Sequence, residues 1–127
     1  MAEISTHVDE GRNFVTFVVS GTVSSSDIVH LARQQPEFKI VNHLVDMTKA
    51  DLSSFDLDGM HEVVAEFAKH DKARQNGRTA VVISNRADSS LVKLFAALSE
   101  AMENSEVSYK TVFTYSDALD WFSRPLR

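Results

Sequence analysis

The sequence predicts one α/β domain, in which an opening β-hairpin is followed by strands that alternate with helices. Two observations support this prediction: apolar residues alternate with polar ones near the start of the chain, and later apolar residues recur at the helical spacing of three and four. The expected order is β-β-α-β-α-β-α-β-α, which implies a mixed sheet that is parallel in its later part. The 127 residues contain no linker-like break and no internal repeat, so a single domain is expected over residues 1–127.

Two β-rich stretches around a polar turn predict the hairpin. Apolar and β-branched residues alternate with polar ones over residues 4–8, residues 10–13 have the composition of a turn, and residues 14–19 are rich in β-branched and aromatic side chains. A short helix is expected next. Residues 24–27 read Ser-Ser-Ser-Asp, which suits a helix N-terminus, and Pro36 ends the helix.

The middle of the chain predicts a buried strand and then the longest helix. Residues 39–47 are rich in apolar side chains, so we expect a central strand that ends at Asp46, followed by a polar loop over residues 48–54. A helix is expected over residues 56–75, and Gly77 stands where a C-terminal cap belongs. Its apolar stripe consists of Leu57, Met60, Val63, Val64, Phe67 and Ala68. The cations expected to complement its negative C-terminus are Lys69, Lys72, Arg74 and Arg78.

Four further elements complete the order. The unbroken apolar run at residues 80–83 is typical of a strand that helices cover on both faces. A third helix is expected from Leu91 to Met102, a strand over residues 107–113 and a last short helix over residues 117–124. The apolar faces of these helices are expected to pack on the sheet and to form the core.

Composition and charge exclude several classes of protein. A net charge of −5 disfavours binding to duplex nucleic acid, because such affinity depends on neutralising phosphates. The absence of cysteine removes disulfides, thiolate nucleophiles and cysteine metal sites, and it fits a reducing compartment. The first residues lack the features of a signal peptide, and no apolar run is long enough to span a bilayer. We therefore expect a cytoplasmic protein.

The sequence contains no recognisable catalytic motif. His61 begins a pattern found in zinc-protease helices, but the residue four positions on is Ala65, so the second metal ligand is missing. The four glycines are isolated, which leaves no phosphate-binding loop, and a Gly-x-Ser-x-Gly nucleophile turn does not occur. We therefore expect no enzyme activity, no metal and no cofactor, and an enzyme with an unrecognised site is the least favoured alternative. The histidines expected at the surface or as helix caps are His7, His30, His43, His61 and His70.

Three segments carry a resemblance to a known family. Residues 43–47 read His-Leu-Val-Asp-Met, a strand that ends in an acid, and residues 77–82 read Gly-Arg-Thr-Ala-Val-Val at the start of the next strand. Residues 112–122 are the most specific segment, with an aromatic-ended strand, an acidic turn and an Ala-Leu-x-Trp-aromatic helix. By these segments and its element order the chain resembles the STAS domains, and among them the SpoIIAA-like branch. The resemblance implies an α/β fold with a STAS-like mixed β-sheet.

The same resemblance implies a module without enzyme activity. The STAS family includes the sporulation anti-anti-sigma factor and the cytoplasmic tails of sulfate transporters. Its domains typically bind partner proteins, nucleotides or lipids, and some are switched by a kinase. The leading expectation is therefore a binding or regulatory module that acts through a protein partner or a small apolar ligand.

The family also directs attention to the loop after the central strand. In the anti-anti-sigma proteins the phosphorylated serine lies in this loop, and the corresponding partner or phosphoacceptor residues here are Asp46, Ser53, Ser54 and Asp56. The glycine that follows the serine in those proteins is missing, and a phosphate would meet nearby acids. The alternative is structural: Ser54 or Asp56 caps the long helix, and the acids complement its positive N-terminus.

Large, adaptable apolar side chains suggest a second kind of site. If a groove remains between the helices, it would form a pocket for an acyl chain or another apolar ligand. The alternative is that these side chains belong to the ordinary core. The residues expected to line the pocket are Phe55, Met60, Phe95, Met102 and Phe113.

The end of the chain suggests a third hypothesis, a peripheral membrane contact through Trp121, Phe122 and Arg124. Indole favours the membrane interface and cations favour anionic lipid. Leu119 shares a face with Phe122, so Trp121 is expected at the edge of that contact and partly exposed. The alternative is an ordinary terminal helix whose indole covers the rim of the core. The shortness of the helix and the negative net charge favour this alternative.

Overall fold

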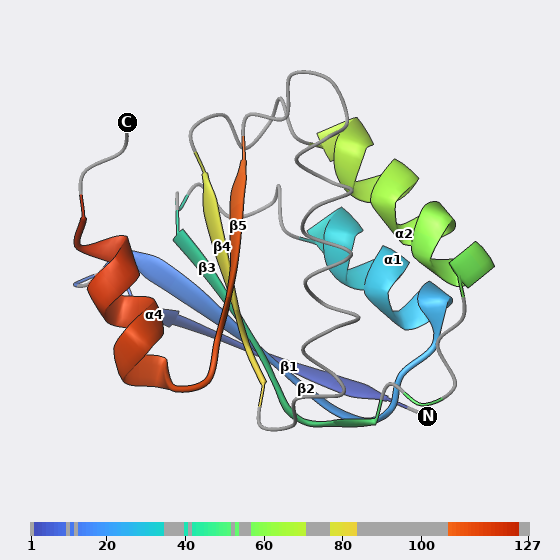
Figure 1. Cartoon of the computed structure of the whole chain (residues 1–127), viewed down its shortest axis with the longest axis horizontal. Helices are drawn as coiled ribbons and strands as arrows, with labels where there is room; N and C mark the ends of the chain where they lie inside the picture. Colours follow the sequence, from blue (N-terminus) through green and yellow to red (C-terminus); the bar gives the residue numbers. More distant parts are fainter. Residues whose placement is uncertain are drawn as a thin grey trace.

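The fold is a five-stranded mixed sheet with helices on both faces, as predicted (Figure 1). The computed structural model describes residues 2–9, 11, 13–34, 40, 42–51, 53, 57–70, 77–83 and 107–124. The strands lie in the order β1-β2-β3-β4-β5. Helices α1 and α2 cover one face of the sheet, and α4 covers part of the other (Figure 1).

The predicted hairpin is confirmed. Strand β1 (Glu3–Asp9) pairs antiparallel with β2 (Phe14–Thr22), from Glu3 opposite Ser20 to Asp9 opposite Phe14. The turn between them contains Asn13 at φ 57°, a left-handed conformation that asparagine adopts more readily than most residues. The hairpin forms one margin of the sheet, with β1 as the edge strand (Figure 1).

The later strands are parallel, which is also as predicted. The sheet continues through β3 (Asn42–Asp51), β4 (Arg78–Val82) and β5 (Ser108–Val112), and every step from β2 onward pairs parallel. All five residues of β4 are buried, which agrees with the apolar run that begins at Ala80, although the strand also buries Arg78 and Thr79. The carboxyl ends of these strands therefore lie at one edge, at the bottom of Figure 1.

The prediction that the central strand ends at Asp46 is wrong. β3 pairs with β4 only as far as Asp46, but a register shift then lets β3 continue beside β2 up to Asp51. This last part has a strand neighbour on one side only, so residues 48–51 remain partly or fully exposed and their largely polar sequence resembles a loop. The first half of the predicted loop over residues 48–54 is therefore strand.

Three helices lie in the described part of the chain. They are α1 (Ser25–Gln34), α2 (Leu57–His70) and α4 (Tyr115–Phe122). The start of α1 is capped reciprocally, because the Ser24 amide donates to Oδ2 of Asp27 over 2.9 Å and the Asp27 amide donates to Ser24 Oγ over 3.4 Å. The third helix expected between Leu91 and Met102 falls outside the described residues.

The core has two parts, one on each face of the sheet. Under α1 and α2 it contains the predicted α2 stripe residues Val63 and Phe67, which are 1% and 5% exposed. Phe67 meets Tyr109 of β5 edge to face, with ring centroids 6.3 Å apart. Under α4 the smaller core is formed by Phe14, Leu44, Ala80, Val82, Val112 and Ala118.

His43 contradicts the expectation that every histidine lies at the surface or caps a helix. It is completely buried in β3, beneath α1 and α2. Its Nε2 lies 3.0 Å from the carbonyl oxygen of Ile40, and its ring packs 5.6 Å from that of Phe17. A neutral imidazole can occupy such a site when a backbone group meets its polar edge.

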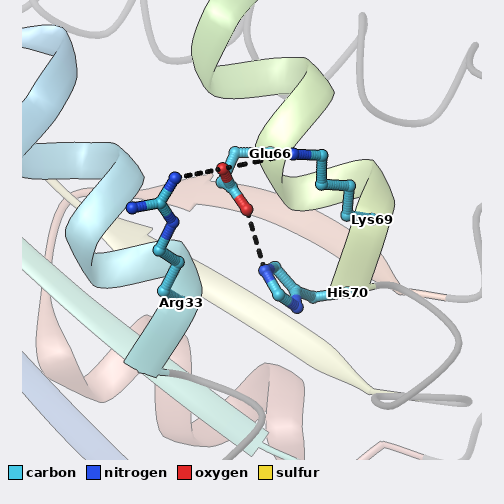
Figure 2. A network of polar contacts seen from close by, with 4 residues as sticks. All are labelled: Arg33, Glu66, Lys69 and His70. Carbon is cyan, nitrogen blue, oxygen red and sulfur yellow. Dashed lines mark hydrogen bonds and ion pairs between the residues drawn. The ribbon is translucent and has the colours of Figure 1, made fainter.

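A buried carboxylate joins α1 to α2 (Figure 2). Glu66 of α2 is only 8% exposed, and its Oε1 accepts a hydrogen bond from Arg33 Nη2 of α1 over 3.1 Å. Lys69 Nζ lies 3.8 Å from Oε1, and His70 Nε2 lies 2.9 Å from Oε2. Burial alone would raise the pKa of Glu66, but these partners outweigh burial and hold its pKa below the usual value. The cluster also places cations at two helix C-termini, where they are favourable.

Candidate functional site

Asp46 is the most constrained polar group near the carboxyl edge of the sheet. It lies in β3 at the last residue paired with β4, and it is 6% exposed. Its Oδ1 accepts hydrogen bonds from the backbone amide of Thr48 over 2.9 Å and from Thr48 Oγ1 over 2.7 Å. Its Oδ2 accepts a hydrogen bond of 2.5 Å from the hydroxyl of Tyr115, in the first turn of α4.

These contacts fix the protonation of both partners. Burial alone would raise the pKa of Asp46, but the hydrogen bonds from Thr48 and Tyr115 and the charge of Lys49 together hold it below the usual value. Burial and the neighbouring Asp46 carboxylate raise the pKa of Tyr115 to about 12. Asp46 therefore stays ionised and Tyr115 stays neutral across the physiological range. The carboxylate already accepts three hydrogen bonds, so it is poorly placed to act as a general base.

The end of β3 forms a second polar feature. The amide of Ser53 donates to Oδ1 of Asp51 over 2.9 Å, which closes an exposed turn just beyond the strand. The side chain and amide of Ser53 both lower the pKa of Asp51, so this carboxylate is ionised as well. Ser53 is exposed at the carboxyl edge, where the sequence predicted a partner or phosphoacceptor loop.

Two aromatic side chains project at the same edge. Phe113 follows β5 directly and is 50% exposed, and Tyr115 is 42% exposed although its hydroxyl reaches Asp46. Between them, Thr114 caps α4, since its Oγ1 accepts from the amide of Asp117 over 3.0 Å. This cap starts α4 at Tyr115, two residues before the predicted start. Phe113 is thus held on a fixed turn with half of its surface in solvent.

The other end of α4 is held by Arg78. Its Nη1 donates a hydrogen bond of 2.6 Å to the carbonyl oxygen of Trp121, and its guanidinium lies 5.6 Å from the centroid of the indole ring. Lys110 of β5 lies 6.0 Å from the same centroid. Arg78 was predicted to complement the C-terminus of α2, but it is buried in β4 and caps α4 instead. Lys69 does lie in the last turn of α2, as expected.

The residues predicted for a membrane contact are already engaged within the protein. Trp121 is half-buried, as expected, and its ring lies 5.8 Å from that of Phe122. The ring centroid of Phe122 in turn lies 6.2 Å from that of Phe14 in β2. Arg124 Nη2 donates to Asp120 Oδ2 over 2.8 Å in an exposed pair. Both aromatic rings therefore contribute to the contact between α4 and the sheet.

The predicted site residues are only partly brought together. Asp46 and Ser53 both lie toward the carboxyl edge, but Asp46 points to α4 whereas Ser53 lies in the turn after β3. Ser54, Asp56, Phe55, Phe95 and Met102 fall outside the described residues. Met60 belongs to α2, and Phe113 is half exposed.

Sequence reasoning missed three residues that shape this region: Thr48, Tyr115 and Arg78. One signal was present. An aspartate inside the apolar run of residues 43–47 must find partners if that run is buried, and the partners turned out to be Thr48 and Tyr115. Nothing in the sequence identified Arg78 as the residue that caps α4, because its partner lies 43 positions away.

Solved structures resemble this one over nearly its whole length. An uncharacterised protein of the DUF3478 family from Shewanella loihica, with a SpoIIAA-like fold, matches 95% of this chain and 93% of its own at 17% identity, with a TM-score of 0.61. An anti-sigma factor antagonist from Mycobacterium paratuberculosis aligns with 98% of this chain over 96% of its own length, at 14% sequence identity and with a TM-score of 0.65. The chain has a SpoIIAA-like fold. No family model and no curated protein matches the sequence.

The fold therefore confirms the predicted STAS-like architecture. Within the described residues there is no group of three or more side chains that could hold a metal ion. In the same part of the chain no helix is long and apolar enough to cross a bilayer. At the carboxyl ends of its strands, the SpoIIAA-like domain presents the turn with the ionised Asp51 and the exposed side chains of Phe113 and Tyr115.

Proposed function

We propose that this SpoIIAA-like domain is a non-enzymatic regulatory module that binds a partner protein at the carboxyl edge of its sheet. One observation supports the proposal most strongly: Phe113 is an aromatic side chain that is half exposed just beyond the carboxyl end of β5, next to the Thr114 cap that begins α4. Exposed aromatic anchors surrounded by polar groups are common at the centres of protein interfaces.

The fold likeness supports a protein as the ligand. One of the similar structures described above is an anti-sigma factor antagonist, a protein that by its name acts on another protein. Fold alone does not carry function, so the proposal depends on the exposed surface and not on the likeness alone. The arrangement of Asp46 supports the absence of catalysis, because its carboxylate already accepts two hydrogen bonds from Thr48 and one from Tyr115 of α4.

Ser53 is the described serine best placed for regulation of this surface. It is exposed, and its amide is hydrogen-bonded to the Asp51 carboxylate. A phosphate on Ser53 would lie next to that carboxylate and would be repelled, so phosphorylation would open the turn and weaken partner binding. An intact mass with one added phosphate on Ser53 in protein from its own cells would support this form of regulation.

The proposal is tested by comparing two exposed apolar side chains of similar exposure. Phe113 is 50% exposed and Val8, on β1, is 47% exposed. The partner is cross-linked to the protein in its own cells, and the amount captured with each variant is measured. Phe113→Ala protein should bind this partner at least about 30-fold more weakly than wild type, which is the effect of losing a central anchor. Val8→Ala protein should bind as wild type does. Equal loss in both variants, or no loss in Phe113→Ala, would refute the proposed surface.

A further inference from the structure

The edge strand β1 lacks two features that protect the opposite edge strand, β5, from pairing with another chain. Among the described residues no strand lies beyond β1, and Ser5, Thr6, His7 and Val8 are exposed, so both faces of this half of the strand are free. Proteins commonly protect edge strands with lysine, proline, bulges or shortness. The five-residue strand β5 carries Lys110, whereas the seven residues of β1 include neither lysine nor proline.

The side chains of β1 match a second copy of the same strand. We propose that two copies of this protein pair antiparallel through β1, centred on Ser5, so that their sheets become continuous. In this register Glu3 of each copy lies opposite His7 of the other, and Ser5 lies opposite Ser5. An imidazole N–H can donate a hydrogen bond to a carboxylate directly across an antiparallel pair, and here the pair occurs twice by symmetry.

The faces of the strand agree with the same register. Ile4 packs on the core beneath α1 and α2, so alternation places Ala2, Thr6 and Val8 on that face as well. Pairing about Ser5 then sets Ile4 opposite Thr6 and Ala2 opposite Val8. In the dimer these pairs continue the face of the sheet that α1 and α2 cover. Glu3, Ser5 and His7 continue the opposite face.

Neighbouring registers are less favourable. Pairing centred on Thr6 would set Glu3 opposite Asp9, which brings two carboxylates together twice in the dimer. Pairing centred on His7 would use only residues 5–9 of each strand and would leave Glu3 without a partner. Pairing centred on Ser5 uses residues 2–8 and places no like charges opposite each other.

A thiol placed at the symmetry axis tests the register. The chain contains no cysteine, so Ser5→Cys introduces the only thiol. Residues directly opposite in an antiparallel pair have Cα atoms about 4.5–5.5 Å apart, which is within the range that a disulfide bridges. Ser108→Cys is the matched control, because Ser108 is an exposed serine on the other edge strand, β5.

Under mild oxidation, Ser5→Cys should form a disulfide-linked dimer at least about tenfold faster than Ser108→Cys. Facing thiols in a dimer have an effective concentration on the order of millimolar, well above that of dilute monomers. His7→Cys, whose thiol would face Glu3, should form its disulfide more slowly than Ser5→Cys. Equal rates for Ser5→Cys and Ser108→Cys would overturn the proposal.

Charge exchange gives a second test on protein without cysteine. Sedimentation should show a concentration-dependent dimer for wild type, and Glu3→Lys and His7→Glu should each weaken it about tenfold, the effect of roughly 1.4 kcal/mol. The double variant Glu3→Lys/His7→Glu should restore the dimer, since lysine and glutamate then face each other. Wild-type protein that stays monomeric, or a double variant as weak as the single ones, would contradict the pairing. Loss of partner capture in Phe113→Ala is a separate readout, so either proposal can fail alone.

Discussion

The hydroxyl of Tyr115 donates a 2.5 Å hydrogen bond to the carboxylate of Asp46, which ties the first turn of α4 to the central strand. At the other end of the helix, Arg78 donates to the carbonyl oxygen of Trp121. Between these two contacts Ala118 is completely buried on the sheet. Helix α4 is therefore fixed at both ends by polar contacts, and these contacts hold the turn that carries Phe113.

The Tyr115 contact predicts a stability loss in alkali. An unfolded tyrosine loses its proton near pH 10, whereas Tyr115 in the folded protein keeps its proton up to a pKa of about 12. The contribution is therefore complete below about pH 10 and is lost as the pH rises toward 12. Denaturant unfolding should show a steeper loss across this window for wild type than for Tyr115→Phe. Parallel curves would show that this contact does not influence stability.

The Arg78 contact predicts a change in the single tryptophan. Arg78→Met removes the guanidinium but keeps most of the side-chain volume, so the unfolding free energy should fall by about 1.5–3 kcal/mol, the range for a charged hydrogen bond. Trp121 emission should shift to the red as the C-terminal end of α4 loosens. Arg124→Ala is the control: its pair with Asp120 is exposed, and its loss should cost less than about 1 kcal/mol and leave the emission unchanged.

The helix stripe on α2 predicts a large packing effect. Phe67 is 5% exposed and meets Tyr109 edge to face, so Phe67→Ala should reduce the unfolding free energy by about 3–5 kcal/mol. The measurement is the midpoint of chemical denaturation. Ala65 lies on the exposed side of the same helix, and Ala65→Ser should shift the midpoint little. A midpoint that is the same in Phe67→Ala and wild type would mean that this face does not hold the core.

The sequence was sufficient to predict the helices and strands that a local pattern of apolar residues defines. The alternation in β1 and the stripe of Val63 and Phe67 predicted a strand and a helix because each pattern repeats within one element. The extension of β3 to Asp51 was missed, since it depends on β2 as a neighbour and not on hydrophobicity. Likewise, the Tyr115 contact with Asp46 joins positions 69 residues apart, and no local pattern encodes it.

The surroundings of Trp121 predict no response to lipid. Its indole is half-buried beside Phe122, with Arg78 and Lys110 within cation–π distance of the ring. Trp121 emission should therefore stay unchanged when anionic vesicles are added at low salt. A blue shift that salt reverses would instead favour the peripheral membrane contact.

The native mass spectrum of the untagged protein, purified from its own cells, tests the central claim most directly. The account predicts a complex of this 14.2 kDa chain with a different protein, and the complex should be lost in Phe113→Ala. Val8→Ala should retain it. Spectra that contain only this chain, in one or two copies, or this chain with a bound lipid, would contradict the claim that the domain acts by binding a partner protein.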